Sequence, residues 1–177
     1  MAVYIGIDNG LKGGMAVLDD QGNILLAAAL PLTVSSSSKN CIDVKALDDT
    51  LTHLFMKYST LTICVEKPAG SKSYRSAVSM ADSFARIETL LTLREYRRQM
   101  ITANKWQKEF WTGKTDNTKA AALTAVSSLW PDHKKFTLRT PCCSVSHDGI
   151  VDALLIAEYC RRTFGKNTRP QPRNRKR

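Results

Sequence analysis

The 177-residue sequence has no apolar stretch approaching the roughly 20 residues that a membrane-spanning helix needs. Its first residues, MAVYIGID, also lack the basic region and hydrophobic core of a secretory signal. We therefore expect a soluble, cytoplasmic protein with no membrane partner. The length predicts one main domain, with enough residues to bury a core.

Paired cysteine spacings are missing as well. The five cysteines have an odd count and none of the spacings that zinc sites use; they are Cys41, Cys64, Cys142, Cys143 and Cys160. This pattern argues against a disulfide framework and a zinc site. We expect reduced thiols, as in a cytosolic compartment.

Acidic side chains are scarce, with 16 Asp and Glu against 26 Lys and Arg, for a net charge of +10. The positive excess lies entirely after Glu66, because residues 1–66 contain four basic and seven acidic side chains. Residues 165–177, GKNTRPQPRNRKR, hold six basic side chains and no acidic one. We expect them to form a disordered arm after a domain of residues 1–164, either solubilising or attracted to nucleic acid.

Apolar periodicity predicts five strands, at residues 3–8, 14–19, 23–30, 61–66 and 99–103. It predicts helices at residues 44–58, 75–96, 104–111, 118–129 and 148–162. The segment LPLTVSSSSKNC is predicted as a polar loop. A leading hairpin followed by β-α-β crossovers predicts an α/β fold with a five-stranded mixed sheet and helices on both faces.

Several of the scarce acids lie at the ends of these elements. Asp8 ends the first strand before a glycine-rich turn, and Glu66 ends the fourth strand. Asp148 and Asp152 are four residues apart, about one helical turn, so both project from one face of the last helix. These carboxylates meet if the first and fourth strands are neighbours and the last helix packs across their ends.

A group of three or four carboxylates cannot stay ionised without cations. Mg²⁺ suits such a group, because it takes hard oxygen ligands and retains water for chemistry. Two such ions about 4 Å apart can activate a water on one side of a phosphodiester and stabilise the leaving oxygen on the other. The acids therefore predict a two-metal site for phosphodiester hydrolysis.

Each acid also has a purely structural interpretation. Asp8 could begin the DNG turn, and Glu66 could pair with the lysine that follows it or with Lys72. Asp148 could be a helix-start residue favoured by the helix dipole. Asp152 has the weakest interpretation of this kind, because it lies inside an apolar helical stretch.

Three segments in order, GIDNGLKGGMAVLD, ICVEKP with SMADSFARIETLL, and HDGIVDALLIAEY, resemble the RuvC-type Holliday junction resolvases of the RNase H-like superfamily, including their compact bacterial and viral versions. The resemblance covers residues 4–159. It implies an RNase H-like fold, a homodimer, two Mg²⁺ or Mn²⁺ ions per active site, and paired nicks across four-way DNA junctions. Asp8 matches the family's first acid, Glu66 the second and Asp152 the last.

One family ligand position is irregular in this sequence. The family's penultimate ligand usually lies three residues before the last acid, where this chain has Gly149. We expect Asp148 to take that role. His147 is a further candidate ligand or water-orienting base, with a polar helix cap as the alternative interpretation.

The resemblance also implies lysines close to the scissile phosphate. Lys114 and Lys119 flank TDNT before a helix, and a helix N-terminus with lysines makes an anion site; ordinary surface charge is the alternative. The other side chains expected to contact DNA are Lys72, Tyr74, Arg75, Lys105 and Lys108. Lys119 is the lysine expected to act in catalysis.

Aromatic residues alternate with lysines in NKWQKEFWTGK. Trp106, Phe110 and Trp111 could stack on unpaired bases, or they could pack in the core.

Three other functions compete with junction resolution. An RNase H-like nuclease acting on flaps, forks or other branched DNA would keep the same fold. A non-catalytic DNA-binding module would be favoured if one acid were absent, but all the required carboxylates are present. An actin-like ATPase shares an acid-glycine turn but needs a second nucleotide-binding half, for which this sequence has no room.

Overall fold

The computed structural model describes residues 1–36, 38–70, 73–113, 115–138 and 145–165. Lys72, Lys114 and most of the basic arm lie outside them. The strands in chain order are β1 (Ala2–Ile7), β2 (Gly14–Asp19), β3 (Ile24–Ala29), β4 (Leu32–Val34), β5 (Asn40–Ile42), β6 (Thr60–Glu66) and β7 (Arg98–Ile101). The helices are α1 (Val44–Lys57), α2 (Tyr74–Leu93), α3 (Ala103–Gln107), α4 (Thr118–Leu129), α5 (Lys134–Thr137) and α6 (Asp148–Phe164).

The main sheet has five strands in the order β3-β2-β1-β6-β7. β1 and β3 are antiparallel to β2, whereas β6 is parallel to both β1 and β7. The predicted five-stranded mixed sheet is confirmed, and its first and fourth predicted strands, β1 and β6, are neighbours. Because Ile7 lies opposite Val65, Asp8 and Glu66 follow at the same end of the sheet.

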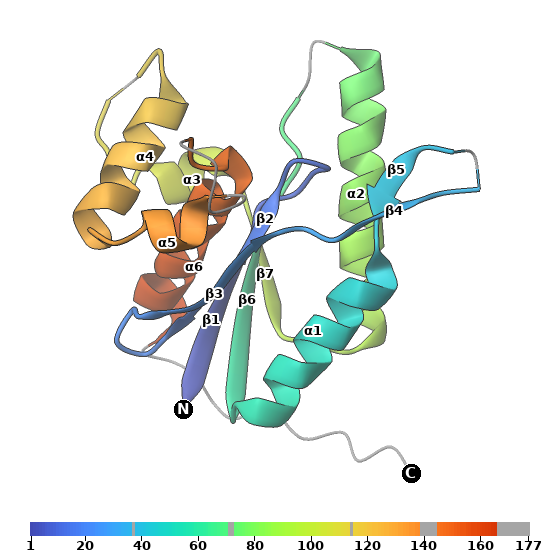
Figure 1. Cartoon of the computed structure of the whole chain (residues 1–177), viewed down its shortest axis with the longest axis horizontal. Helices are drawn as coiled ribbons and strands as arrows, with labels where there is room; N and C mark the ends of the chain where they lie inside the picture. The colour runs from blue at the N-terminus through green and yellow to red at the C-terminus, as the bar shows by residue number, and fades with distance from the viewer. Residues whose placement is uncertain (37, 71–72, 114, 139–144, 166–177) are drawn as a thin grey trace.

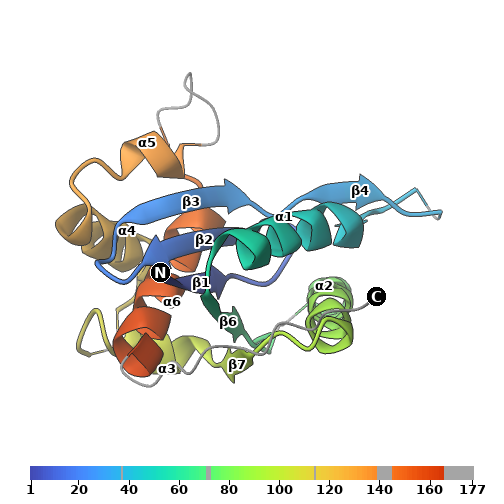
Figure 2. The ribbon, with the colours of Figure 1, turned by 90° about the horizontal axis from the view of Figure 1, so that it is seen from below.

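Helices cover both faces of the sheet, as predicted. α6 crosses one face with α3, α4 and α5 around it, and α1 and α2 lie on the other side (Figure 1 and Figure 2). Strand side chains alternate between the faces. Ile5 and Ile7 therefore join the core beneath α1 and α2, whereas Tyr4 joins the core around α6.

α6 packs unusually close to β1, because the residues at the contact are small. A Cβ added to Gly6 would lie 2.2 Å from the carbonyl oxygen of Ala153 and 2.3 Å from the amide nitrogen of Ala157. Backbone therefore packs on backbone. This contact fixes α6 across the end of the sheet where Asp8 and Glu66 emerge.

Local capping explains where three of the helices begin. Asp43, Ser73 and Asn117 each accept a hydrogen bond from the backbone N–H three residues later, at the starts of α1, α2 and α4. α6 differs, because its N-cap His147 makes no side-chain cap hydrogen bond. Backbone packing of Gly149 on Lys12 and Gly13, in the turn after β1, holds the start of α6 in place of a side-chain cap.

The segment predicted as a polar loop contains a two-stranded ribbon. β4 and β5 pair antiparallel, with Leu32 opposite Ile42 and Val34 opposite Asn40. Strands of three residues are too short to show a period-two pattern, so the prediction was wrong here. The other differences are small: α3 is shorter than predicted, and the short helix α5 was not predicted.

None of the helices among the described residues is long and apolar enough to cross a membrane. Cys41, Cys64 and Cys160 are buried free thiols. Cys142 and Cys143 lie outside the described residues.

Candidate active site

The four predicted acids come from three elements that meet at one end of the sheet. Asp8 directly follows β1, and Glu66 is the last residue of the neighbouring strand β6. Asp148 is the first residue of α6, and Asp152 lies one turn later. The contact between α6 and β1 thus carries two helix acids to the two strand-end acids.

The acids interact electrostatically. Burial, and then the charges of Glu66, Asp152 and Asp148, raise the pKa of Asp8 well above its ordinary value. Burial, followed by Glu66 and Asp148, raises the pKa of Asp152 to about 7, and Lys119 partly opposes this rise. Burial also raises the pKa of Glu66. Such mutual repulsion is the condition that a bound cation relieves.

Two of the acids are engaged by other side chains. The indole Nε1–H of Trp106 donates a hydrogen bond to Oε2 of Glu66 at 2.8 Å. The ammonium group of Lys119 forms an ion pair with Asp148. Glu66 thus has a neutral partner and Asp148 a cationic one.

The chemistry of these carboxylates suits a divalent cation, but the distances between them are larger than one bound ion requires. Carboxylate oxygens are the ligands that Mg²⁺ prefers, and these four repel one another. Among the described residues, however, no three His, Cys, Asp or Glu side chains lie close enough together to hold one ion. Glu66 is held by Trp106 and Asp148 by Lys119, so each of these two carboxylates has a partner outside the group of acids.

His147 and Asn9 each carry a buried polar atom without a hydrogen-bond partner among the described residues. These atoms are Nδ1 of His147 and Oδ1 of Asn9. The His147 side chain does not cap α6, so the polar-cap interpretation does not hold. Nδ2 of Asn9 donates to the carbonyl oxygen of Met80 at 3.2 Å, which ties the turn after β1 to α2.

Gly149, at the irregular ligand position, lies where no side chain fits. A Cβ there would be 2.2 Å from the carbonyl oxygen of Lys12 and 2.7 Å from the backbone of Gly13. Gly13 and Gly149 also form an isolated parallel β-bridge. The start of α6 is therefore seated on the glycine turn after Asp8, and an acid is sterically excluded from this position.

An open cleft of about 570 Å³ lies above the acids. Its lining includes Asp8, Asp148 and Asp152, and α2 forms part of the opposite wall. Three cationic side chains, Lys12, Arg75 and Lys119, also line it. The cleft thus combines acids with surrounding cations, an arrangement suited to holding a phosphate next to carboxylates.

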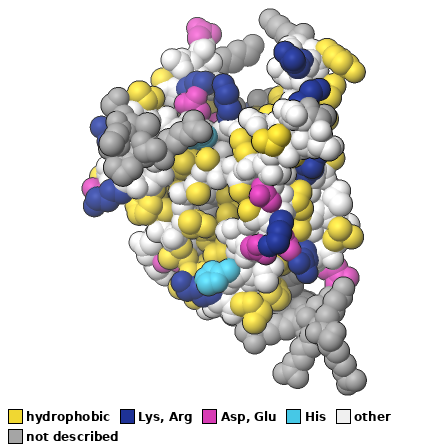
Figure 3. Space-filling view, turned by 45° about the vertical axis from the view of Figure 1, so that its right-hand side comes forward, with side chains coloured by type: hydrophobic (Ala, Val, Ile, Leu, Met, Phe, Trp, Pro, Cys, Tyr) yellow, Lys and Arg dark blue, Asp and Glu magenta, His cyan; other side chains and the backbone are white. Residues whose placement is uncertain are grey.

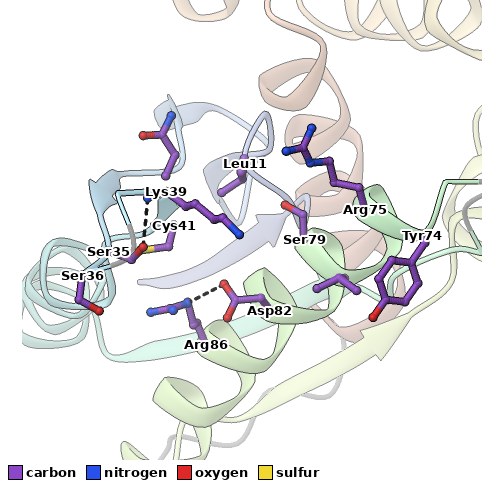
Figure 4. Close-up of a pocket in the computed structure, with 12 residues that line it drawn as sticks. Leu11, Ser35, Ser36, Lys39, Cys41, Tyr74, Arg75, Ser79, Asp82 and Arg86 are labelled. Atoms are coloured by element: carbon purple, nitrogen blue, oxygen red, sulfur yellow. Dashed lines mark hydrogen bonds and ion pairs between the residues drawn. The ribbon is translucent and has the colours of Figure 1, made fainter.

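A larger groove, of about 890 Å³, adjoins this cleft between α2 and the β4–β5 ribbon. Leu11, Arg75 and Ser79 line both spaces. Lys39 extends from the ribbon toward α2, and Arg86 on α2 is paired with Asp82 at 2.8 Å (Figure 4). The groove therefore continues from the cleft and carries cationic, hydroxyl and apolar side chains.

The predicted DNA-contacting residues have different surroundings. Tyr74 is 86% exposed at the start of α2, and Arg75 lines both the cleft and the groove. Lys105 and Lys108 are exposed on or just after α3 and do not line the acid cleft. Trp106 is buried, so it is unavailable for base stacking.

Sequence reasoning missed Lys12 and Lys39. Lys12 lies inside the glycine turn, where its charge could have been noticed, whereas Lys39 lies in the segment predicted as a loop. On the face seen in Figure 3, basic and acidic side chains are interspersed and do not form one patch of a single sign. The cationic side chains that line the cleft together with the acids are Lys12, Arg75 and Lys119.

No protein-family model and no curated protein matches the sequence. Solved structures are similar in fold. Thermus thermophilus RuvC aligns with 15% identity and a TM-score of 0.53, covering 96% of this chain and 99% of that chain. T. thermophilus RuvC in complex with a Holliday junction substrate aligns with 12% identity and a TM-score of 0.51, covering 97% and 99%.

A complex of Fowlpox virus resolvase with Holliday junction DNA aligns more weakly, with 12% identity and a TM-score of 0.45 over 92% of this chain and 98% of that chain. The fold assignment rests on the two Thermus structures, which match over nearly the whole length of both chains. The chain therefore has the RNase H-like fold of RuvC.

Proposed function

We propose that this chain is a structure-selective DNA endonuclease that resolves four-way junctions by paired, metal-dependent phosphodiester hydrolysis. The observation that carries the proposal is the placement of four acids, from the ends of β1 and β6 and the start of α6, at one end of the sheet, where three of them line a cleft together with cations. The similarity in fold to RuvC, including RuvC in complex with a Holliday junction substrate, adds support.

In this proposal Asp8, Glu66, Asp148 and Asp152 hold the metal, with His147 as a further candidate ligand. Mg²⁺ suits these donors, Mn²⁺ can substitute, and two such ions would activate a water and stabilise the leaving oxygen. The acids must be ionised to act as ligands, so the raised pKa of Asp8 and of Asp152 makes them dependent on that cation.

Cationic side chains bind the phosphate in this proposal. Lys12, Arg75 and Lys119 line the cleft beside the acids. In the free protein Lys119 is paired with Asp148. In this proposal Lys119 leaves Asp148 and contacts the phosphate when substrate and metal bind. Lys119 then stabilises negative charge that develops on the phosphate.

The substrate strand continues from the cleft into the adjoining groove. Arg75 lines both spaces, and Lys39 faces the groove from the ribbon. Tyr74, with its exposed ring, offers a stacking surface for an unpaired base. Lys72, Lys105, Lys108 and Lys114 remain predicted DNA contacts, and residues 165–177 a predicted basic arm.

A homodimer is part of the proposal, because paired nicks require two active sites. Ala81 and Ala85 are exposed on α2, and small residues there allow a second helix to approach closely.

Cleavage of a mobile four-way junction tests the proposal. With Mg²⁺ we expect symmetric nicks from the wild type, and binding without cutting from Asp8→Asn. Asp132→Asn, which changes an exposed acid on another part of the surface, should cut normally. If flaps or forks are cut while junctions stay intact, the related nuclease function replaces this one. Absence of binding to any branched DNA would overturn both.

A further inference from the structure

Trp106 is buried beside Glu66, the acid at the end of β6. It belongs to α3, a helix of five residues, and is only 1% exposed although Asn104, Lys105 and Lys108 around it are exposed. Its Nε1–H donates to Oε2 of Glu66 at 2.8 Å, across 40 residues of sequence. Because indole is a donor only and carries no charge, this bond does not neutralise the carboxylate.

The path of the chain explains how the indole reaches Glu66. β7 pairs in parallel with β6, with Ile101 opposite Glu66, and the amide of Lys67 donates to the carbonyl oxygen of Ile101 at 2.7 Å. α3 follows β7 almost immediately, so it begins at the same end of the sheet as Glu66. Trp106 is thus brought to Glu66 by the strand pairing next to it.

Neighbouring aromatic rings hold the indole in place. The Trp106 ring lies 5.8 Å from that of Trp111 in an edge-on arrangement and 6.4 Å from that of Phe110. Such packing restricts rotation of a buried ring. The direction of the N–H group is therefore set by the core, and the orientation of the Glu66 carboxylate is set in turn by the N–H group.

We propose that Trp106 is a positioning residue for Glu66: its indole holds one carboxylate oxygen and orients the other for the metal. This inference rests on the proposed function, in which Glu66 is a metal ligand. A neutral donor is well suited to this role, because a lysine there would compete with the cation. Partners that orient metal ligands typically change metal affinity or activity by about 10–100-fold when removed.

Trp106→Phe tests this role, because it keeps an aromatic ring in the core and removes the N–H group. We expect the Mg²⁺ concentration for half-maximal junction cleavage to rise by about 10-fold or more, with junction affinity unchanged. Trp130→Phe is the matched control: its Nε1–H also donates at 2.8 Å, to the carbonyl oxygen of Gly22 in the turn at the far end of β2. It should leave the Mg²⁺ midpoint unchanged.

A second measurement needs neither DNA nor cleavage. The chain has three tryptophans, so its ¹⁵N spectrum contains three indole N–H signals. We expect the Trp106 signal to shift when Mg²⁺ is added to the free wild-type protein, and not when it is added to Glu66→Gln. The Trp130 signal should not respond in either protein.

The outcomes separate the two proposals. An unchanged Mg²⁺ midpoint in a folded Trp106→Phe protein overturns the positioning role, and so does a Trp106 signal that ignores Mg²⁺. If Trp106→Phe fails to fold, the spectra of the wild type and Glu66→Gln decide alone, with signals assigned from the Trp111→Phe and Trp130→Phe variants. If the wild type cuts no branched DNA but its Trp106 signal responds to Mg²⁺, the proposed substrate fails and the positioning role stands.

Discussion

At the scale of single residues, burial raises the pKa values of three acids, Asp8, Glu66 and Asp152. Asp8 and Asp152 lose solvation next to other carboxylates, and each therefore has a raised pKa. For Asp152 the charge of Lys119 partly opposes this rise, and Lys119 is also paired with Asp148. A metal-free site of this kind opposes folding whenever its acids are ionised.

The pH dependence of stability follows from Asp152. Its pKa is raised from 3.8 to about 7, so the folded protein retains a proton that the unfolded chain releases. In EDTA the wild type should lose stability as pH rises from about 4 to 7, by up to about 4 kcal/mol from this group. Asp152→Asn should remove the share that Asp152 contributes, in urea unfolding measured at pH 5 and pH 8, whereas Asp8 and Glu66, whose pKa values are also raised, keep a remaining loss of the same sign.

Asp132→Asn provides the control and should leave the difference in stability between pH 5 and pH 8 unchanged, because the pKa of Asp132 is lowered from 3.8. Lys135 lowers the pKa of Asp132, so this acid contributes stability above its unfolded pKa that is lost as pH falls. An Asp152→Asn protein with the same pH dependence as the wild type would contradict the interpretation.

At the scale of elements, the position of α6 depends on backbone contacts made possible by glycine. A Cβ added to Gly6 of β1 would lie 2.2 Å from a backbone atom of α6. A Cβ added to Gly149, at the start of α6, would lie 2.2 Å from a backbone atom of the turn after β1. These contacts place Asp148 and Asp152 over the end of β1. The irregular spacing of the acids follows from the same contact, since the position that would carry a ligand is used for packing.

Gly149→Ala should therefore destabilise the protein by about 1–3 kcal/mol or more, because the atoms it meets are backbone and cannot rotate away. Cleavage should fall as well, since α6 must move with its acids. Gly149→Asp should behave likewise and should not act as a ligand. Urea unfolding measures the loss, and Gly70→Ala, which meets nothing within 4 Å, is the neutral control. A stable, more active Gly149→Asp protein would refute this prediction.

The β4–β5 ribbon is the second element with a consequence for function. Lys39 lines the groove that continues from the acid cleft. If Lys39 contacts a phosphate, Lys39→Ala should reduce the magnitude of the slope of log affinity against log salt concentration by about 0.7–0.9. The affinity is measured in the Asp8→Asn protein, which does not cut the DNA. Lys57→Ala, an exposed lysine at the end of α1, is the control. An unchanged slope would contradict the proposed contact between the groove and DNA, but it would not contradict the proposed nuclease activity.

At the scale of the whole molecule, two cores lie on opposite faces of one sheet, and they differ in the size of their side chains. The core beneath α1 and α2 is built from large aliphatic side chains such as Leu47, Leu51 and Ile87. The core around α6 includes the small residues Ala153 and Ala157, which allow the close approach to β1. The cleft that three of the acids line lies between α6 and the start of α2.

Much of this arrangement could be predicted from local signals. Apolar runs located the five strands of the main sheet, and each of Asp8 and Glu66 stood out as a charge at a strand end. The four-residue spacing put Asp148 and Asp152 on one helical face. The ribbon was missed because three-residue strands carry no readable period, and α5 because a four-residue helix carries none either.

The sequence by itself determined which residues are acids, at which element ends they lie, and the order of strands and helices, because periodicity and turn chemistry depend on near neighbours. The tertiary structure decided what each acid faces: Trp106 at Glu66, 40 residues away, and Lys119 at Asp148, 29 residues away. It also decided that Gly149 must remain a glycine. Such contacts depend on how β1, β6, α3 and α6 pack in space, which no local pattern encodes.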